Sequence, residues 1–163
     1  YLEQLATFGA PDRDPRMRVV SVAYYALVDA KRFAKSLARA GDVTVGKVLV
    51  DWEGEAGGPA QLVGEDGESM PLAFDHERIL GVAIQRLRGK LDYSPIGFQL
   101  LADRFTLLEL QDVHETVLGR TLNKDSFRRR MLASGEIVAT GEMQSGVGHR
   151  PAELYRFVKR SAV

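Results

Sequence analysis

The stretch FTLLELQDVHETVLGRTLNKDSFRRRMLASG, residues 105–135, decides the fold of the last part of the chain. Thr106 is followed three residues later by a glutamate, which is the spacing of a capping box at a helix N-terminus. Apolar side chains then recur at helical spacing, and Gly119 is placed to end the helix. Asn123 is a typical N-cap for a second helix, which Gly135 would close. The stretch therefore predicts two helices joined by a short turn.

Two short β-strand patterns follow this pair of helices. They are EIVATGE at residues 136–142 and AELYRFV at residues 152–158, and a glycine-rich turn separates them. The order helix, short turn, helix and β-hairpin is that of a winged helix-turn-helix. The hairpin would then be the wing, with a flexible basic tip.

The second helix of this unit is the predicted reader of DNA. In a helix-turn-helix the second helix enters the major groove, and its N-terminal residues face the bases. Phe127, Met131 and Leu132 fall on one arc, which we expect to pack inward on the preceding helix. The polar residues outside this arc are the predicted DNA contacts: Lys124, Ser126, Arg128, Arg129 and Arg130. Arginine suits this role because its guanidinium binds guanine or a phosphate bidentately.

The wing and the local charge support the same interpretation. His149 and Arg150 follow the glycines of the predicted wing tip, where they would reach a phosphate or the minor groove. The whole chain has a formal charge of zero, but residues 121–163 carry 8 basic and 4 acidic side chains, net +4. Clustered positive charge is the footprint of a nucleic-acid surface. Three successive arginines are also typical of a solvated helix face, and winged helices also serve as protein-interaction modules.

The preceding residues indicate a mixture of strands and helices. Alternating or β-branched patterns predict three strands, at residues 1–8, 17–28 and 43–52, of which the second is expected to be a central strand. A weaker pattern indicates a short hairpin around residues 61–63. Apolar spacing predicts a short helix and a longer amphipathic one, within residues 29–41 and 74–91. Asp75 is the expected N-cap of the longer helix.

A domain boundary is expected shortly after this longer helix. Ser94 precedes Pro95, and a proline disfavours helical backbone in the residue before it. We therefore expect two domains, residues 1–92 and residues 93–163.

Composition excludes several kinds of site. The chain has no cysteine, so disulfides and thiolate metal sites are absent from it. The three histidines are widely spaced, and the carboxylates at Glu53, Glu55, Glu65, Asp66 and Glu68 lie in a glycine-rich loop rather than on one helix face. We therefore expect no metal site. No apolar run approaches the roughly 20 residues that span a bilayer, so no membrane segment is predicted.

Four segments carry a resemblance to a known family. They are YLEQLATFGAPDRDPRMRVVSVAYYALV (1–28), LAFDHERILGVAIQRLRGKLDYSPIGFQLL (72–101), FTLLELQDVHETVLGRTLNKDSFRRRML (105–132) and GHRPAELYRF (148–157). Together they resemble the Nudix-related transcriptional regulators of NAD metabolism, bacterial proteins that join a Nudix-like domain to a C-terminal winged helix. The resemblance covers nearly the whole chain except residues 30–70.

The resemblance implies both a fold and a function. The fold class is α+β, a partial Nudix-like α/β sandwich followed by a winged helix-turn-helix domain. The implied function is that of a DNA-binding repressor of genes of NAD or nucleotide-cofactor metabolism. It implies a homodimer on a double-stranded palindromic operator, ADP-ribose or a related nucleotide as the effector, a cytoplasmic location and no required cofactor.

The chain departs from the catalytic pattern of Nudix hydrolases. Hydrolysis of a diphosphate needs the box Gly-x5-Glu-x7-Arg-Glu-x2-Glu-Glu, whose carboxylates hold Mg²⁺, and we find no such spacing here. We expect the box to precede Tyr1, because the chain starts without methionine and in a predicted strand, as a fragment would. The chain is therefore expected to have no catalytic residues. A rival interpretation is a Nudix pyrophosphatase with an accessory winged-helix tail, and a third is a winged helix that only mediates assembly.

The segment DRDPR holds the candidate effector contacts. Arg13 and Arg16 flank a proline turn and would meet a pyrophosphate as bidentate donors. The alternative is that Asp12 and Asp14 pair with these arginines in an ordered loop.

Overall fold

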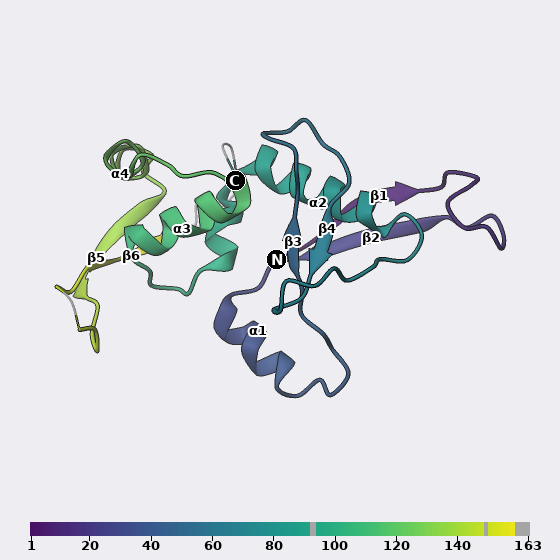
Figure 1. The fold of residues 1–163 in the computed structure, drawn as a ribbon. Helices are drawn as coiled ribbons and strands as arrows, with labels where there is room; N and C mark the ends of the chain where they lie inside the picture. Colours follow the sequence, from purple (N-terminus) through teal and green to yellow (C-terminus); the bar gives the residue numbers. More distant parts are fainter. Residues whose placement is uncertain (92–93, 149, 159–163) are drawn as a thin grey trace.

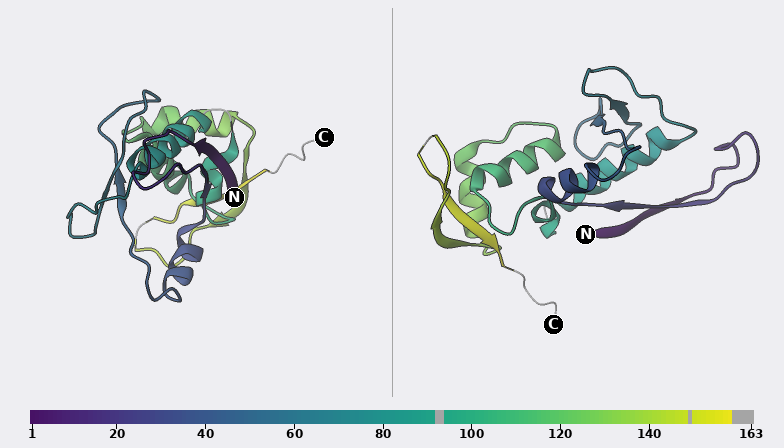
Figure 2. Two further views of the ribbon diagram at one scale, coloured as in Figure 1. Left: turned by 90° about the vertical axis from the view of Figure 1, so that its right-hand side faces the viewer. Right: turned by 90° about the horizontal axis from the view of Figure 1, so that it is seen from below.

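The computed structural model describes residues 1–91, 94–148 and 150–158. Its strands are β1 (Leu2–Phe8), β2 (Ser21–Ala26), β3 (Lys47–Leu49), β4 (Gln61–Val63), β5 (Ile137–Met143) and β6 (Glu153–Phe157). Its helices are α1 (Ala30–Leu37), α2 (His76–Lys90), the 3-10 helix η1 (Pro95–Leu100), α3 (Leu107–Leu118) and α4 (Lys124–Ala133). The expected junction at residues 92 and 93 lies outside the described residues. The β1–β2 ribbon and the β5–β6 hairpin lie at opposite ends of the molecule (Figures 1 and 2).

The N-terminal ribbon pairs β1 with β2 antiparallel, with a register shift between Gln4 and Ala6. Leu5 and Phe8 are buried, whereas Tyr24 on the opposite face is 60% exposed. The expected central strand over residues 17–28 is wrong, because β2 has six residues and, among the residues that the structure describes, pairs with β1 alone at the edge of a two-stranded sheet. The pairing ends at Phe8, so residues 17–20 have no strand beside them to extend the ladder.

A second ribbon, β3–β4, is also shorter than the sequence predicts. The expected strand over residues 43–52 narrows to the three residues of β3. Its partner β4 is equally short, which limits the ladder to three residue pairs. The weaker hairpin expected around 61–63 is confirmed in β4, which also bridges back from Val63 to Ser69.

Helix α2 confirms the longer amphipathic helix and packs closely on the loop before β4. A Cβ at Gly81 would lie 1.8 Å from the carbonyl oxygen of Gly58, so only glycine fits here. Asp75 is the N-cap residue but makes no side-chain cap hydrogen bond. Its carboxylate instead accepts from Arg13, with Nε at 2.9 Å and Nη2 at 2.7 Å. That ion pair fixes the start of the helix to the loop after β1.

The other end of α2 contributes to a core shared with the following helices. Leu91 is buried together with Leu27 and Ile96, and Val117 and Leu118 at the end of α3 pack against them. The cluster thus joins residues on both sides of the expected junction. The side of α2 toward β1 carries a charged contact, in which Lys90 and Arg86 pair with Glu3.

The C-terminal helices form the predicted helix-turn-helix. The capping box at Thr106 and the αL residue Gly119 at the end of α3 are both present, as the sequence predicts. Asn123 caps α4 by accepting from the amide of Ser126. The core of this unit is made of these buried side chains: Phe105, Leu107, Leu110, Phe127, Met131, Ile137 and Tyr155.

The β5–β6 hairpin is joined to Phe105, which precedes the N-cap residue of α3. Phe105 and Tyr155 exchange two backbone hydrogen bonds, of 3.0 and 2.8 Å. This bridge adds a third short strand position to the hairpin and closes the sheet over the helices. The arrangement of α3, α4 and this sheet is the expected winged helix.

Replacing Thr106 by Ala removes the capping box and leaves helix donors at the start of α3 without side-chain partners. We expect the free energy of unfolding to fall by about 1 kcal/mol. Urea denaturation followed by circular dichroism measures the change. The matched control is Thr121→Ala, because Thr121 is exposed in the turn between the helices. An equal loss in both variants would contradict the capping role.

Acid should weaken the contact between β1 and α2. Hydrogen bonds from Lys90 and Tyr1 lower the pKa of Glu3 from 4.5 to about 2. The charged form is favoured in the folded state, so this stability is complete above pH 4.5 and is lost as pH falls toward 2. We expect Glu3→Gln to remove about 1 kcal/mol at pH 7, after allowing for solvent screening of a partly exposed pair. Urea midpoints at pH 7 and pH 3 should differ less in this variant than in the wild type.

Candidate nucleic-acid interface

Helix α4 presents one buried and one exposed side. Phe127 and Met131 are buried, as predicted, but Leu132 is 45% exposed. The expectation that Leu132 packs inward is wrong, because a residue five positions after Phe127 lies about 140° around the helix from it. The five predicted DNA contacts on this helix are all exposed: Lys124, Ser126, Arg128, Arg129 and Arg130. They share the solvent-facing side of the predicted recognition helix.

An edge-to-face contact between two rings joins α4 to α3. His114 of α3 is buried and meets the Phe127 ring edge-on, with the ring centroids 5.1 Å apart. The Arg130 guanidinium lies 5.6 Å from the centroid of the same Phe127 ring. Arg130 is therefore partly engaged with its own helix, in agreement with the expectation that it lies toward the flank. Arg128 and Arg129 project from the exposed side.

A hydrogen-bond network sets the turn between α3 and α4. Gln111 donates from Nε2 to Glu115 at 2.8 Å and to the Leu122 carbonyl at 3.1 Å. The Leu122 amide donates back to the same Glu115 carboxylate at 2.8 Å. Hydrogen bonds from Gln111 and Leu122 lower the pKa of Glu115. The network fixes the direction in which α4 leaves α3, and nothing in the spacing of the sequence pointed to it.

The wing is closed by contacts across the hairpin. The backbone N–H of Gln144 donates to the Ala152 carbonyl at 2.7 Å. The Thr140 hydroxyl donates to the Leu154 carbonyl at 2.9 Å, beside an irregularity in the β5–β6 register. Arg150 is exposed after the wing tip. His149, the other predicted wing contact, lies outside the described residues.

Two further contacts tie the wing to the helices. Arg104, just before α3, forms an ion pair with Glu142 on β5. Tyr155 of β6 is buried in one core with Phe127 and Met131 of α4, and this burial raises the pKa of its hydroxyl. The wing and α4 therefore share one core and present their exposed groups from it.

The candidate effector contacts in DRDPR are both engaged within the protein. Arg13 is buried against Asp75 and also donates to the Ser21 hydroxyl at 2.7 Å. The hydrogen bonds from Arg16 lower the pKa of Asp14 to about 2. Arg16 itself remains 71% exposed. The expected alternative holds for the pair Arg16 and Asp14, whereas Arg13 pairs with Asp75 rather than with an aspartate of its own loop.

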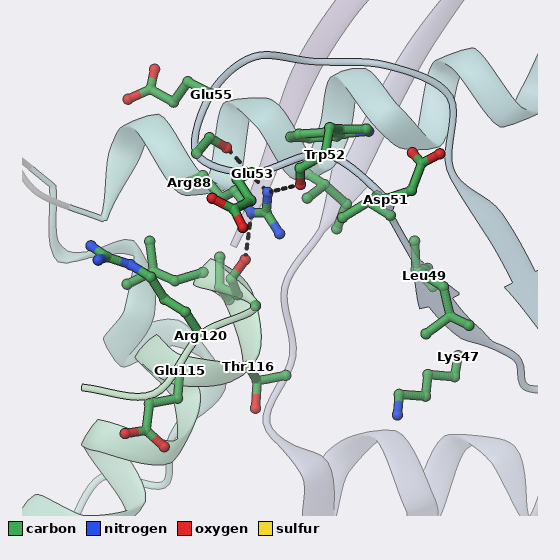
Figure 3. A pocket seen from close by; sticks show the side chains of 17 residues that line it. Lys47, Leu49, Asp51, Trp52, Glu53, Glu55, Arg88, Glu115, Thr116 and Arg120 are labelled. Atoms are coloured by element: carbon green, nitrogen blue, oxygen red, sulfur yellow. Dashed lines mark hydrogen bonds between the residues drawn. The ribbon is translucent and has the colours of Figure 1, made fainter.

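A cavity of about 1090 Å³ lies between the N-terminal part and the end of α3 (Figure 3). Strand β3, the loop at residues 50–55, α2 and residues 115–120 line it. Arg88 of α2 reaches from one wall to the other. A charged residue within a helical apolar pattern carries no spacing signal that would have revealed its role.

The described residues contain no group of three or more histidine, cysteine or carboxylate side chains arranged to hold a metal ion. No helix within them is long and apolar enough to cross a membrane.

Comparison with known proteins locates this interface within a family. Residues 97–157 match the NrtR DNA-binding winged helix domain. The chain is 36% identical over 157 residues to the "ADPR responsive transcriptional repressor NtrR" of Acinetobacter baylyi. That match covers 96% of this chain and 56% of the relative, so the chain spans little more than half of the relative's length.

Solved structures show the same likeness over nearly the whole chain. Shewanella oneidensis NrtR is 34% identical, with a TM-score of 0.71, and the match covers 97% of this chain and 64% of that one. The same protein complexed with a 27mer DNA matches with a TM-score of 0.73, at the same identity and coverage. A MutT/nudix family protein from Enterococcus faecalis is 26% identical, with a TM-score of 0.62, covering 97% of this chain and 62% of that one. The chain therefore belongs to the Nudix-related regulators of the NrtR type, with a Nudix-like part followed by the family's winged helix domain.

Proposed function

We propose that this chain is the DNA-binding and part of the effector-sensing portion of a transcriptional repressor. The observation that carries the proposal is the exposed arginine face of α4, set on a buried base of Phe127 and Met131. The NrtR structure complexed with DNA resembles this chain at 34% identity. The regulated genes would be those of NAD or nucleotide-cofactor metabolism, in accordance with the family.

The proposed division of labour follows the expected domains. Residues 93–163 bind a double-stranded operator through Lys124, Ser126, Arg128, Arg129 and Arg130, with the wing residues His149 and Arg150 on the backbone. Residues 1–92 belong to the sensing domain, and a homodimer would place two recognition helices on a palindromic site. The location is cytoplasmic, where such an operator is found.

Catalysis is the rival function, and we propose that this chain lacks it. Residues 1–163 contain no Nudix box spacing. The relative from Acinetobacter baylyi is named a repressor rather than a hydrolase. Release of AMP from ADP-ribose by the purified chain with Mg²⁺ would favour the pyrophosphatase instead.

Replacing Arg128 and Arg129 by Ala should weaken operator binding. Loss of a base-reading arginine costs about 1–3 kcal/mol, and loss of a phosphate contact lowers the salt slope by about one. Fluorescence anisotropy would compare duplexes from upstream of the chain's own gene and of NAD-synthesis genes with a scrambled duplex, over a salt series. Arg39→Ala is the control, because Arg39 is an exposed arginine after α1. Unchanged affinity in the double variant would remove α4 from the interface, leaving a winged helix that serves assembly.

The effector is proposed to be ADP-ribose or a related nucleotide, and Arg16 its most accessible phosphate contact. The Arg16 guanidinium lies 5.0 Å from the centroid of the Phe74 ring, and Phe74 lines a small pocket together with Arg13 and Arg78. The guanidinium of Arg13 already donates hydrogen bonds to Asp75 and Ser21, so we propose that Arg13 holds the loop rather than the effector.

Replacing Arg16 by Ala should weaken ADP-ribose binding about tenfold, which corresponds to one lost charge-assisted hydrogen bond. Isothermal titration calorimetry measures this dissociation constant. Arg18→Ala is the matched control, since Arg18 is exposed in the same loop. Equal binding by both variants and the wild type would place the effector elsewhere.

A further inference from the structure

Arg88 is a charged side chain that is buried between the two parts of the molecule. It is 5% exposed although it lies on an otherwise amphipathic helix. Its Nε donates to the Val117 carbonyl of α3 at 2.9 Å. Its Nη1 donates to the Trp52 carbonyl at 3.0 Å and to the Gly54 carbonyl at 3.1 Å. Figure 3 shows this side chain reaching both walls of the cavity.

The burial of this guanidinium needs compensation. Burial lowers the pKa of Arg88, although arginine remains protonated. Within the described residues no carboxylate lies within ion-pair distance of it. Its compensation comes from the three carbonyls, from the Trp52 ring, whose centroid lies 4.7 Å from Cζ, and from the negative charge of Glu53 beyond ion-pair distance. A buried charge held in this way adds little net stability and is better suited to fixing one geometry.

The acceptor on α3 lies where a cation is most favourable. Val117 belongs to the last turn of α3, whose carbonyls have no partner within the helix. The negative end of the helix dipole also lies there. Gly119 follows with φ of 70°, and a Cβ on it would lie 2.8 Å from Nη2 of Arg88. Glycine at this position therefore allows the left-handed backbone and also leaves room for the Arg88 guanidinium.

We propose that Arg88 is a positioning residue that holds the winged helix in a fixed orientation against the N-terminal part. It does so by binding the end of α3 and the loop from Trp52 to Gly54 at the same time. A movement of that loop would therefore be transmitted to α3 and, through the turn held by Gln111, to α4. The consequence for DNA rests on the proposed function, whereas the clamp itself does not.

The test compares how the two parts tumble in solution. Backbone ¹⁵N relaxation gives a rotational correlation time for residues 2–91 and another for residues 105–157. The wild type should show one common value. Arg88→Met keeps the apolar stem and removes the donors. The correlation time of residues 105–157 divided by that of residues 2–91 should then fall below one, as for two bodies of unequal size that tumble independently. A ratio unchanged from the wild type in a folded Arg88→Met variant overturns the proposal.

Arg86→Met is the matched control on the same helix. Arg86 is an exposed arginine whose hydrogen bonds go to Glu3 and to the Leu5 carbonyl, both in the N-terminal part. This variant should keep the common correlation time. If Arg86→Met separates the parts as Arg88→Met does, the effect belongs to the stability of α2 and the proposal fails.

A second pair of variants reaches the same contact if Arg88→Met does not fold. Gly119→Ala retains the arginine but displaces its guanidinium, and it should separate the two correlation times. Gly67→Ala introduces similar backbone strain at φ of 82° with nothing within 4 Å of the new Cβ, so it should leave them equal. Equal times in Gly119→Ala would contradict the clamp.

Operator binding separates this proposal from the proposed function. Anisotropy on a duplex with a single half-site should give the same affinity for Arg88→Met as for the wild type, because α4 itself is unchanged. Wild-type chain that binds no DNA, while Arg88→Met still separates the parts, would sink the repressor but leave the clamp. Selective DNA binding by the wild type, with one common correlation time in Arg88→Met, would support the repressor and overturn the clamp.

Discussion

The structure depends on the helix α2, which packs against β1 on one side and against the core at the end of α3 on the other. Toward β1, the basic residues Arg86 and Lys90 of α2 form ion pairs with Glu3. On the other side the helix contributes Leu91 to the core that includes Ile96 and the end of α3. Each neighbour alone is small, and small units bury too little surface to be stable without further support. The shared helix lets both parts use one apolar surface.

Apolar burial and hydrogen bonding have different tasks at this junction. Burial of Leu91 and Ile96 is favourable but roughly non-directional, so it holds the parts together without defining their angle. Arg88 defines that angle because each of its hydrogen bonds requires a particular carbonyl in a particular direction. Similarly, the core at Phe127 attaches α4, while the Gln111 and Glu115 network sets the direction in which α4 leaves the turn.

The sequence was most informative where one local pattern determines one element. The capping box at Thr106, the left-handed residue Gly119 and the N-cap Asn123 all lie where their local chemistry predicts. The strands were less predictable, because β2 and β3 end where their partner strands end, and partner length is not a local property. On α4, the helical period predicts the exposure of the arginines, and the same period explains why Leu132 is exposed rather than buried.

Contacts between distant residues could not be predicted from spacing. The sequence predicts Arg13 as an effector contact, with an aspartate of its own loop as the alternative partner, but the ion pair forms with Asp75 at the start of α2. Arg88 gave no signal, since its partners are backbone carbonyls that every sequence supplies. Such contacts exist only once the chain has folded, and a linear pattern does not record them.

The bridge between Phe105 and Tyr155 has a consequence for the order in which the winged helix assembles. The helices α3 and α4 lie between these two residues, so the ladder closes a long loop, and closing such a loop slows folding. On the ribosome both helices emerge before β6, and the apolar base of the recognition helix then lacks its cover. Folding of the candidate interface is therefore completed by a strand that packs against the buried side of α4. Truncation or delayed synthesis before Tyr155 would leave α3 and α4 as a collapsed pair without a fixed orientation.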